Sequence, residues 1–397
     1  MRKAVIVDIV RTPAGRGKAG GALSECHPVE LLRTVLTALV DRTGIDPVLV
    51  DDVIAGCVGQ AKEQAVNIGR QGVLASGWPE SIPATTIDRQ CGSSQQALHF
   101  AAQGIMAGSY DIAVACGVES MSRVPIGAPT IGLDPYGERI HQRYAPGLVN
   151  QGVSAELIAQ KWALDREALD AYSARSHERA ARTAAEGGFD HEIVPVTIRL
   201  ADGTEQIVSV DETIRPGTTA EGLGGLRASF ATPEMTERFP GIEWNITPGN
   251  SSPLTDGASA ALVMGEDVAE RLGLTARARV HAMALAGDDP ILMLTAPIPA
   301  TQKVLDKAGL TIDDIDTYEV NEAFAPVPLA WQIALGADPD RLNPRGGAIA
   351  LGHALGASGT RLMGTMINHL EATRGRYGLQ TMCEGGGMAN ATIIERL

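Results

Sequence analysis

Residues Tyr110–Cys116 have the sequence YDIAVAC, and residues Tyr377–Cys383 have the similar sequence YGLQTMC. A second pair of similar segments keeps the same order, because Asp41–Ile45 (DRTGI) matches Asp306–Leu310 (DKAGL). Both pairs are separated by nearly the same number of residues, as expected of an internal duplication. The sequence therefore predicts two homologous halves, related by a pseudo-twofold axis that brings their matching loops together.

Each half is predicted to alternate strands and helices. Apolar runs predict buried strands at 4–10, 52–58 and 111–116. Helically spaced apolar residues predict one helix between Pro28 and Gly44, and another that follows Cys91 and ends near Gly108. This alternation predicts an α/β layer structure with largely parallel strand pairing.

The segment 121–249 differs in pattern from both halves. It contains a helix-like run at 155–185 and a glycine-rich stretch at 221–225, and we expect it to form a covering loop domain. The predicted division is an N-terminal half at 1–120 plus 250–270, the loop domain at 121–249, and a C-terminal half at 271–397. A surface elaboration without contact to the chemistry is the alternative.

Composition limits the class of protein. The 397 residues exceed the usual size of a single core, and a formal net charge of −14 argues against nucleic acid as a partner. Five cysteines without a C-x-x-C pair fit reduced thiols in the cytoplasm. No stretch is long and apolar enough for a membrane helix, and Asp8 interrupts the only apolar run near the N-terminus. We therefore expect a cytoplasmic protein without a membrane partner.

Three residues are candidates for nucleophilic chemistry. Cys91 falls where a strand leads into a helix, a position at which free N–H groups and the helix dipole favour a thiolate. His353 lies between glycines and could accept its proton, and Cys383 enters the glycine loop 385–387, which could present N–H groups to an oxyanion. Packing roles for a buried cysteine or histidine remain the plain alternative, and a zinc site made of all three residues is another.

Several further segments complete a pattern in chain order. They are NEAF at Asn321–Phe324, NPRGG at Asn343–Gly347 leading to His353, GNSS at Gly249–Ser252 with DGASA at Asp256–Ala260, and IPA at Ile298–Ala300. Together with the segment around Cys91, they resemble the thiolase family over essentially the whole chain. The resemblance implies a thiolase-like, duplicated five-layer (αβαβα) fold with an inserted loop domain.

The resemblance also implies an acyltransferase reaction. Cys91 would attack the keto carbon of a 3-ketoacyl-CoA and hold the acyl chain as a thioester, while His353 accepts the proton of the thiol. Cys383 would protonate the departing acetyl-CoA carbanion. Coenzyme A, deprotonated with help from His353, would then release a shortened acyl-CoA. In the condensing direction, Cys383 would instead remove a proton from acetyl-CoA.

Further roles follow from the same resemblance. One oxyanion hole would use His353 and a water held by Asn321, and the other would use the backbone N–H groups of Cys91 and Gly385. The contacts of coenzyme A would include an arginine at the adenine, a serine at the pantetheine and two residues of NEAF, namely Arg227, Ser252, Ala323 and Phe324. Coenzyme A is then a substrate and no cofactor is tightly bound. A homodimer or homotetramer is expected.

One departure from the family pattern bears on the acyl group. Val149–Gly152 (VNQG) occupies the place where short-chain biosynthetic thiolases carry His-Met-Gly, so we expect a larger acyl group and a degradative role. A biosynthetic acetyl-CoA acetyltransferase is the alternative, and an inactive acyl-CoA-binding relative is more remote. A ketoacyl synthase would be expected to use two histidines, and Cys383 argues against it.

Overall fold

The computed structural model describes residues 2–200 and 202–397 and contains the same strand order twice. The N-terminal order is β4-β3-β5-β8-β1 and the C-terminal order is β10-β11-β12-β9, so β3, β5, β8 and β1 correspond to β10, β11, β12 and β9. The strand directions also correspond. The pairs β3–β5 and β10–β11 are parallel, and the later pairs β5–β8, β8–β1, β11–β12 and β12–β9 are antiparallel. The predicted duplication is confirmed. The strands are β1 Ala4–Arg11, β2 Gly15–Arg16, β3 Asp52–Gly56, β4 Ala84–Ile87, β5 Ile112–Ser120, β8 Thr255–Gly265, β9 Ala278–Gly287, β10 Thr317–Val320, β11 Tyr377–Glu384 and β12 Met388–Arg396.

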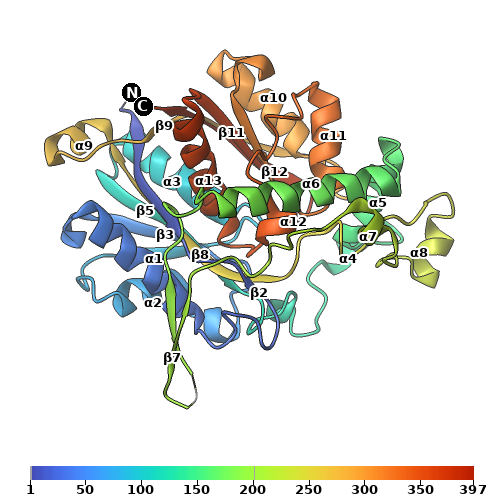
Figure 1. The fold of residues 1–397 in the computed structure, drawn as a ribbon, viewed down its shortest axis with the longest axis horizontal. Coiled ribbons are helices and arrows are strands. Elements are labelled where there is room, and N and C mark those ends of the chain that lie inside the picture. Colours follow the sequence, from blue (N-terminus) through green and yellow to red (C-terminus); the bar gives the residue numbers. More distant parts are fainter. Residues whose placement is uncertain (1, 201) are drawn as a thin grey trace.

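Helices complete five layers around these strands (Figure 1). Helices α3 (Ser93–Ala107) and α13 (Ser358–Thr373) occupy matching places in the two halves and pack against each other between the half-sheets. Helices α1 (Pro28–Thr43) and α2 (Ile68–Ala75) cover one outer face, and α10 (Pro297–Ala308) with α11 (Pro326–Leu335) covers the other. The half-sheets join where β1 and β9 pair. The duplicated αβαβα fold is therefore confirmed.

Local sequence explains the ends of α1. The His27 side chain accepts a hydrogen bond from the backbone N–H of Val29, and Pro28 occupies the first turn, where its missing N–H has no consequence. Gly44 closes the helix in the left-handed conformation, with φ +68°, and bonds the carbonyl of Val40. The helix predicted between Pro28 and Gly44 is confirmed.

Two expectations about secondary structure were wrong. Pairing is not largely parallel, because the loop 385–387 between β11 and β12 is too short for a crossover helix and enforces an antiparallel hairpin. The run 155–185 is not one helix but two, α5 (Gln151–Lys161) and α6 (Arg166–Ala185). The backbone turns at Ala163, which has φ +52°, and Asp165 then starts α6 because its side chain accepts from the N–H of Ala168.

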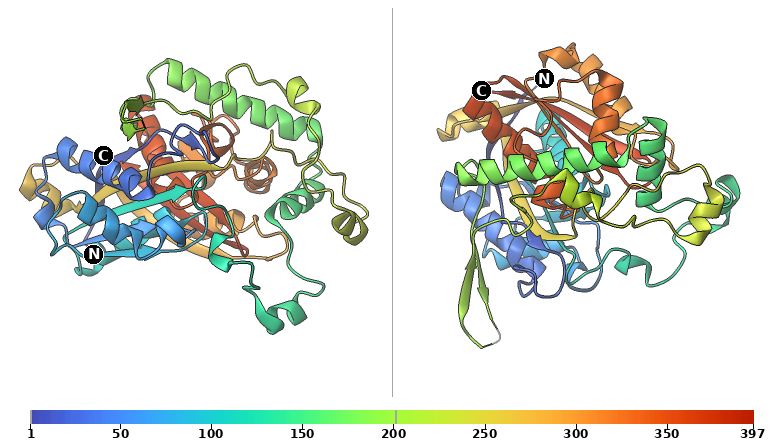
Figure 2. Two further views of the ribbon diagram at one scale, coloured as in Figure 1. Left: turned by 90° about the horizontal axis from the view of Figure 1, so that it is seen from below. Right: turned by 45° about the vertical axis from the view of Figure 1, so that its right-hand side comes forward.

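The segment 121–249 contributes short elements around the two halves. Both views in Figure 2 show the parts around α4 (Gly137–Arg143) and α8 (Pro233–Arg238) standing away from the sheets. The glycine-rich stretch forms helix α7 (Ala220–Gly224). The elements not yet given are the hairpin of β6 (Val196–Arg199) and β7 (Glu205–Val208), α9 (Glu266–Leu272) and α12 (Ala348–Leu351). The predicted domain boundaries remain a prediction. No helix in the described part of the chain has the length and apolar character needed to cross a membrane.

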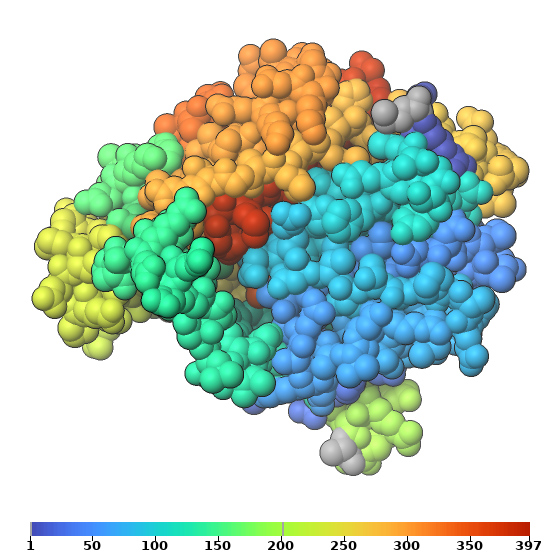
Figure 3. Space-filling view, turned by 180° about the vertical axis from the view of Figure 1, so that it is seen from behind, coloured from blue at the N-terminus to red at the C-terminus, as the bar shows by residue number. Residues whose placement is uncertain are grey.

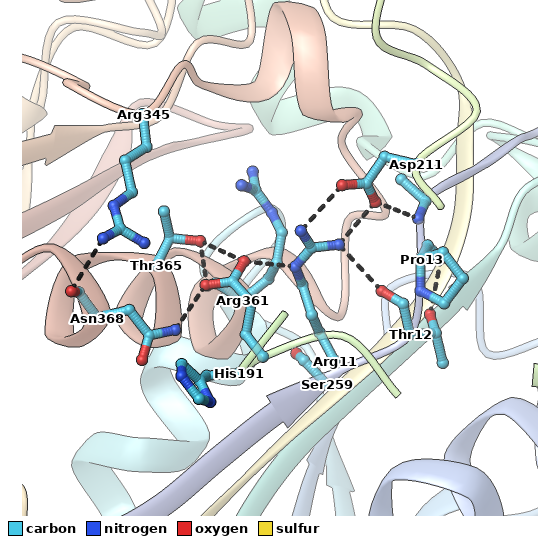
Figure 4. Close-up of polar contacts among 12 residues, drawn as sticks. Arg11, Thr12, Pro13, His191, Asp211, Ser259, Arg345, Arg361, Thr365 and Asn368 are labelled. Carbon is cyan, nitrogen blue, oxygen red and sulfur yellow. Dashed lines mark hydrogen bonds and ion pairs between the residues drawn. The ribbon is translucent and has the colours of Figure 1, made fainter. Parts of the chain in front are cut away.

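A buried ionic network ties this segment to the core (Figure 4). Arg11, at the end of β1, donates to Glu192 at 2.7 Å and to both carboxylate oxygens of Asp211 at 2.6 and 2.9 Å. Thr365 and Asn368 of α13 donate to the same Glu192. Removing one partner from such a network leaves an uncompensated buried charge, which typically destabilises by about 3–5 kcal/mol. The network therefore fixes where 190–212 lies against β1 and α13.

Candidate active site

The three candidate residues come from different elements. Cys91 lies in the turn between β4 and α3, His353 in the loop between α12 and α13, and Cys383 on β11. Their exposed fractions are 3, 4 and 0 %. Gln90, directly before Cys91, has φ +48°, a left-handed conformation that is strained for a residue with a side chain. The tight turn thus presents Cys91 at the start of α3.

Asn321 connects His353 with Cys383. It directly follows β10, and its Nδ2 lies 3.3 Å from Nε2 of His353. The same side chain hydrogen-bonds the sulfur of Cys383 and favours its thiolate, but burial dominates and raises the pKa of Cys383 to about 12. At neutral pH, Cys383 is therefore a thiol that can give up a proton.

The tautomer of His353 follows from its partners. Ser358 Oγ lies 2.7 Å from Nδ1 of His353 and donates its only hydrogen to the carbonyl of Ala354 at 2.8 Å. Nδ1 must therefore carry the imidazole proton, which leaves the lone pair of Nε2 facing Asn321. Burial, followed by the charge of Arg361, lowers the pKa of His353 to about 3. The imidazole is neutral, and its Nε2, which faces Nδ2 of Asn321, is the nitrogen that can accept a proton.

Burial and the helix start act in opposite directions on the thiol of Cys91. Burial raises the pKa of the Cys91 thiol well above its usual range, and the neighbouring Cys383 and Glu384 raise it further. The backbone N–H groups of Cys91 and Gly385 hydrogen-bond the sulfur and favour the thiolate, but they do not outweigh burial. Cys91 is therefore a thiol at rest although the N–H groups at the helix start favour the thiolate, and proton transfer must accompany attack.

The loop 385–387 depends on glycine. Gly386 and Gly387 have φ values of +87° and +80°, which only glycine adopts without strain. A Cβ built on Gly385 would lie 3.1 Å from Oε1 of Gln90 and 3.3 Å from Nε2 of Gln151. Figure 3 shows a hollow in which residues from near the C-terminal end of the chain are visible between segments of the N-terminal half and of the inserted segment. Within the loop, Gly386 is exposed and Gly385 is half-buried, so an extended substrate could reach it.

Glu322, the acidic residue of NEAF, holds the backbone that leads to His353. Its Oε1 accepts from the hydroxyl of Tyr172 at 2.8 Å and from Nδ2 of Asn343 at 2.9 Å. Its Oε2 accepts from the hydroxyl of Ser176 at 2.7 Å and from the N–H of Ile349 at 3.1 Å. A buried carboxylate with this many donors fixes the position of α6 against α12.

Sequence reasoning missed two residues that position His353. Ser358 sets its tautomer, and the nearby glycine-rich sequence was the available signal. Glu119 of β5 accepts from the N–H of Gly356 at 2.9 Å and from the N–H groups of Val58 and Gly59 at 3.0 and 2.9 Å. Nothing in the local sequence indicates that Glu119 reaches these backbones.

The predicted contacts of coenzyme A lie on adjoining loops. The N–H of Ser252 donates to the carbonyl of Ala323 at 3.0 Å, and Ser251 forms a β-bridge with Phe324. The ring of Phe324 meets that of Phe230 edge to face, with 6.1 Å between centroids. The exposed Arg227 belongs to the same loop as Phe230. The loops that carry the four predicted contact residues therefore lie next to one another.

Metal binding was the remaining alternative for the three candidates. Across residues 2–200 and 202–397, no group of three or more histidine, cysteine, aspartate and glutamate side chains is arranged to hold a metal ion. The described geometry therefore offers the zinc hypothesis no ligand set.

Comparisons with known proteins agree on one family. The models of the thiolase N-terminal and C-terminal domains match residues 4–267 and 274–396. The chain is 49 % identical to steroid 3-ketoacyl-CoA thiolase FadA6 of Mycobacterium tuberculosis, covering 100 % of this chain and 95 % of that one. It is 44 % identical to a 3-ketoacyl-CoA thiolase of Vibrio cholerae, with 100 % of both covered. The acetyl-CoA acetyltransferase of Bacillus anthracis superposes with a TM-score of 0.89 at 35 % identity, covering 100 % of this chain and 99 % of that chain. The chain belongs to the thiolase family.

Proposed function

We propose that this acyltransferase cleaves a 3-ketoacyl-CoA with coenzyme A, through a thioester on Cys91, and that it works in the degradative direction. The observation that carries the proposal is the position of Asn321, which hydrogen-bonds the sulfur of Cys383 and has Nδ2 at 3.3 Å from Nε2 of His353. An acid and a base beside one amide match the two proton transfers that carbon–carbon cleavage requires.

In the first half-reaction, the sulfur of Cys91 bonds to the keto carbon while its proton moves to Nε2 of His353. The tetrahedral intermediate collapses, the bond between the α and β carbons breaks, and the acetyl-CoA carbanion takes the proton of Cys383. The proton on His353 then passes to the Cys383 thiolate, which restores the neutral imidazole. This sequence suits a resting thiol and a neutral base, the states that burial favours here.

In the second half-reaction, His353 accepts the proton of the coenzyme A thiol. The thiolate of coenzyme A attacks the thioester carbon, the bond to Cys91 breaks, and the leaving Cys91 sulfur takes the proton back from His353. Both half-reactions develop negative charge on an oxygen. The N–H groups of Cys91 and Gly385, which point at the Cys91 sulfur at rest, would stabilise one such oxygen, and His353 with an Asn321-held water would stabilise the other.

Coenzyme A would lie along the loops that carry Arg227, Ser252, Ala323 and Phe324. The exposed guanidinium of Arg227 would meet the adenine end, and the paired backbones of Ser252 and Ala323 would line the pantetheine. These contacts suit a substrate that enters and leaves in each cycle. We further infer that the enzyme is a cytoplasmic homodimer or homotetramer, which light scattering of the purified protein would test.

The acyl group is proposed to be longer or bulkier than acetyl. Gln151 lies beside Gly385, so the residue that differs from the short-chain pattern faces the reacting loop. The similarity to a steroid 3-ketoacyl-CoA thiolase fits such an acyl group. The structural similarity to an acetyl-CoA acetyltransferase favours the second candidate, condensation of two acetyl-CoA molecules.

Thiolysis by the wild type and by Cys91→Ala tests the proposal, with coenzyme A and a panel of 3-ketoacyl-CoAs from acetoacetyl-CoA upward. Cleavage by the wild type alone, fastest for longer or bulkier members, is expected. Preference for acetoacetyl-CoA would favour the condensing enzyme instead. Equal activity of Cys91→Ala would remove Cys91 as the nucleophile, and no cleavage of any member would favour an acyl-CoA-binding role.

A further inference from the structure

Glu384, next to Cys383, is a buried carboxyl group that the reaction steps above do not use. Its residue is 0 % exposed, and neither of its carboxyl oxygens has a hydrogen-bond partner in the described part of the chain. Oδ1 of Asn390, also 0 % exposed, lacks a partner in the same way. Buried polar atoms without partners are rare and require a physical explanation.

The side chains of Glu384 and Asn390 both lie against Gly92, at the start of α3. A Cβ built on Gly92 would overlap Oε1 of Glu384 and lie 2.7 Å from Nδ2 and 2.9 Å from Oδ1 of Asn390. Nδ2 of Asn390 donates to the carbonyl of Gly92 at 2.9 Å. The missing side chain at position 92 therefore makes room for the pair, one residue from Cys91.

The protonation state of Glu384 decides whether the pair is satisfied. An ionised carboxylate only accepts hydrogen bonds, and Oδ1 of Asn390 also only accepts, so the two would repel. A protonated carboxyl group has an O–H that can donate to Oδ1 of Asn390, which satisfies both orphaned groups. Nδ2 of Asn390 donates one hydrogen to the carbonyl of Gly92, and its second hydrogen makes no bond to Glu384 among the described residues, so Oδ1 of Asn390 still lacks a donor.

We propose that Glu384 is a positioning residue that stays protonated in the active enzyme, donates to Asn390 beneath the nucleophile turn, and suppresses thiolate formation at Cys91 when it ionises. This inference rests on the proposed role of Cys91 as nucleophile. The effect is a regulation of that nucleophile by pH, and Glu384 itself touches no substrate atom.

Electrostatics agree with this geometry. Burial raises the pKa of Glu384 to about 8, Arg89 and then the nearby backbone N–H of Asn390 lower it, and Asp88 raises it. Asp88 and Arg89 precede Cys91 on the same turn. The other titratable groups that face the carboxyl group of Glu384 are Cys91 and Cys383. An ionised Glu384 in turn raises the pKa of both cysteines. Alkaline conditions would otherwise promote thiolate formation, so ionisation of Glu384 opposes that trend.

Alkylation of Cys91 by iodoacetamide, followed peptide by peptide with mass spectrometry across a pH series, tests the proposal. Glu384→Gln keeps the shape and a donor for Asn390 but has no proton to lose. We expect Cys91 in this variant to react about tenfold faster than in the wild type at alkaline pH, and at a similar rate at neutral pH, since one pKa unit is a factor of ten. Identical pH profiles would overturn the proposal.

Glu319→Gln is the matched control. Glu319 is also buried, its two carboxyl oxygens lack partners among residues 2–200 and 202–397, and burial raises its pKa to about 8, but it lies beside Arg361. Its replacement should leave the Cys91 profile unchanged, and an equal acceleration would overturn the specific role of Glu384. Alkylation is read without turnover, so a failed thiolysis assay would count against the proposed function alone.

A second measurement leaves position 384 unchanged in case Glu384→Gln does not fold. Infrared difference spectra of Glu319→Gln between neutral and alkaline pH should show loss of a protonated carboxyl band, assigned to Glu384. Absence of that band at neutral pH would overturn the proposal.

Discussion

Nδ2 of Asn321 lies 3.3 Å from Nε2 of His353, while Oδ1 of the same amide has no hydrogen-bond partner among the described residues. The same side chain hydrogen-bonds the sulfur of Cys383 and lowers its pKa against the effect of burial. One amide group is therefore shared by the proposed base and the proposed acid, and its oxygen remains available for a water or a substrate. Turnover should depend on Asn321 more than folding does.

Asn321→Ala is expected to lower kcat by about 10²–10³, the usual effect of losing an oxyanion donor. The melting temperature should change little, because the substitution removes an amide group whose oxygen has no hydrogen-bond partner among the described residues. Steady-state thiolysis and thermal melting check both parts. Normal turnover would remove Asn321 from the mechanism.

Ser358→Ala should lower kcat at least about tenfold, because Nδ1 of His353 loses its acceptor and the tautomer with a free Nε2 is no longer favoured. Nitrogen-15 NMR of the imidazole would report the loss of the fixed tautomer. Ser173→Ala is the control, since this buried serine bonds only the carbonyl of Leu169 in its own helix. An unchanged imidazole spectrum in Ser358→Ala would contradict the assignment.

Gln151→Met tests the inferred acyl pocket. The change restores the residue type of the short-chain pattern beside Gly385 and should raise kcat/KM for acetoacetyl-CoA relative to longer substrates about tenfold, a typical effect of reshaping a substrate pocket. Gln142→Met, on the exposed face of α4, is the control and should not alter the ratio. A constant ratio in Gln151→Met would place the acyl group elsewhere.

Glu319→Gln should change how stability depends on pH. Burial raises the pKa of Glu319 from 4.5 to about 8, so the unfolded chain releases this proton earlier than the folded protein. The free energy of unfolding of the wild type should therefore fall as pH rises from 4.5 to 8, relative to the variant, by up to about 1.4 kcal/mol per pH unit. Urea unfolding of both proteins across this range measures the difference, which would be constant if Glu319 were ionised throughout.

Much of the fold could be predicted because its signals are local or repeated. The match of Tyr110–Cys116 with Tyr377–Cys383 correctly predicted the duplication that appears as β5 and β11. The break between α5 and α6 was missed although Asp165 offers a helix-capping signal. Strand direction was misjudged since it depends on connections, and only the short loop 385–387 indicated the β11–β12 hairpin.

The sequence by itself determined the two halves, the helix ends and the residue types of the candidate site, because periodicity and motifs are written in neighbouring residues. Tertiary structure alone decided that Asn321 connects His353 with Cys383, and that Ser358 fixes the imidazole tautomer. It also decided that Cys91 is a thiol at rest, because the pKa of a thiol depends on desolvation by segments distant in the sequence, and burial here outweighs the helix start.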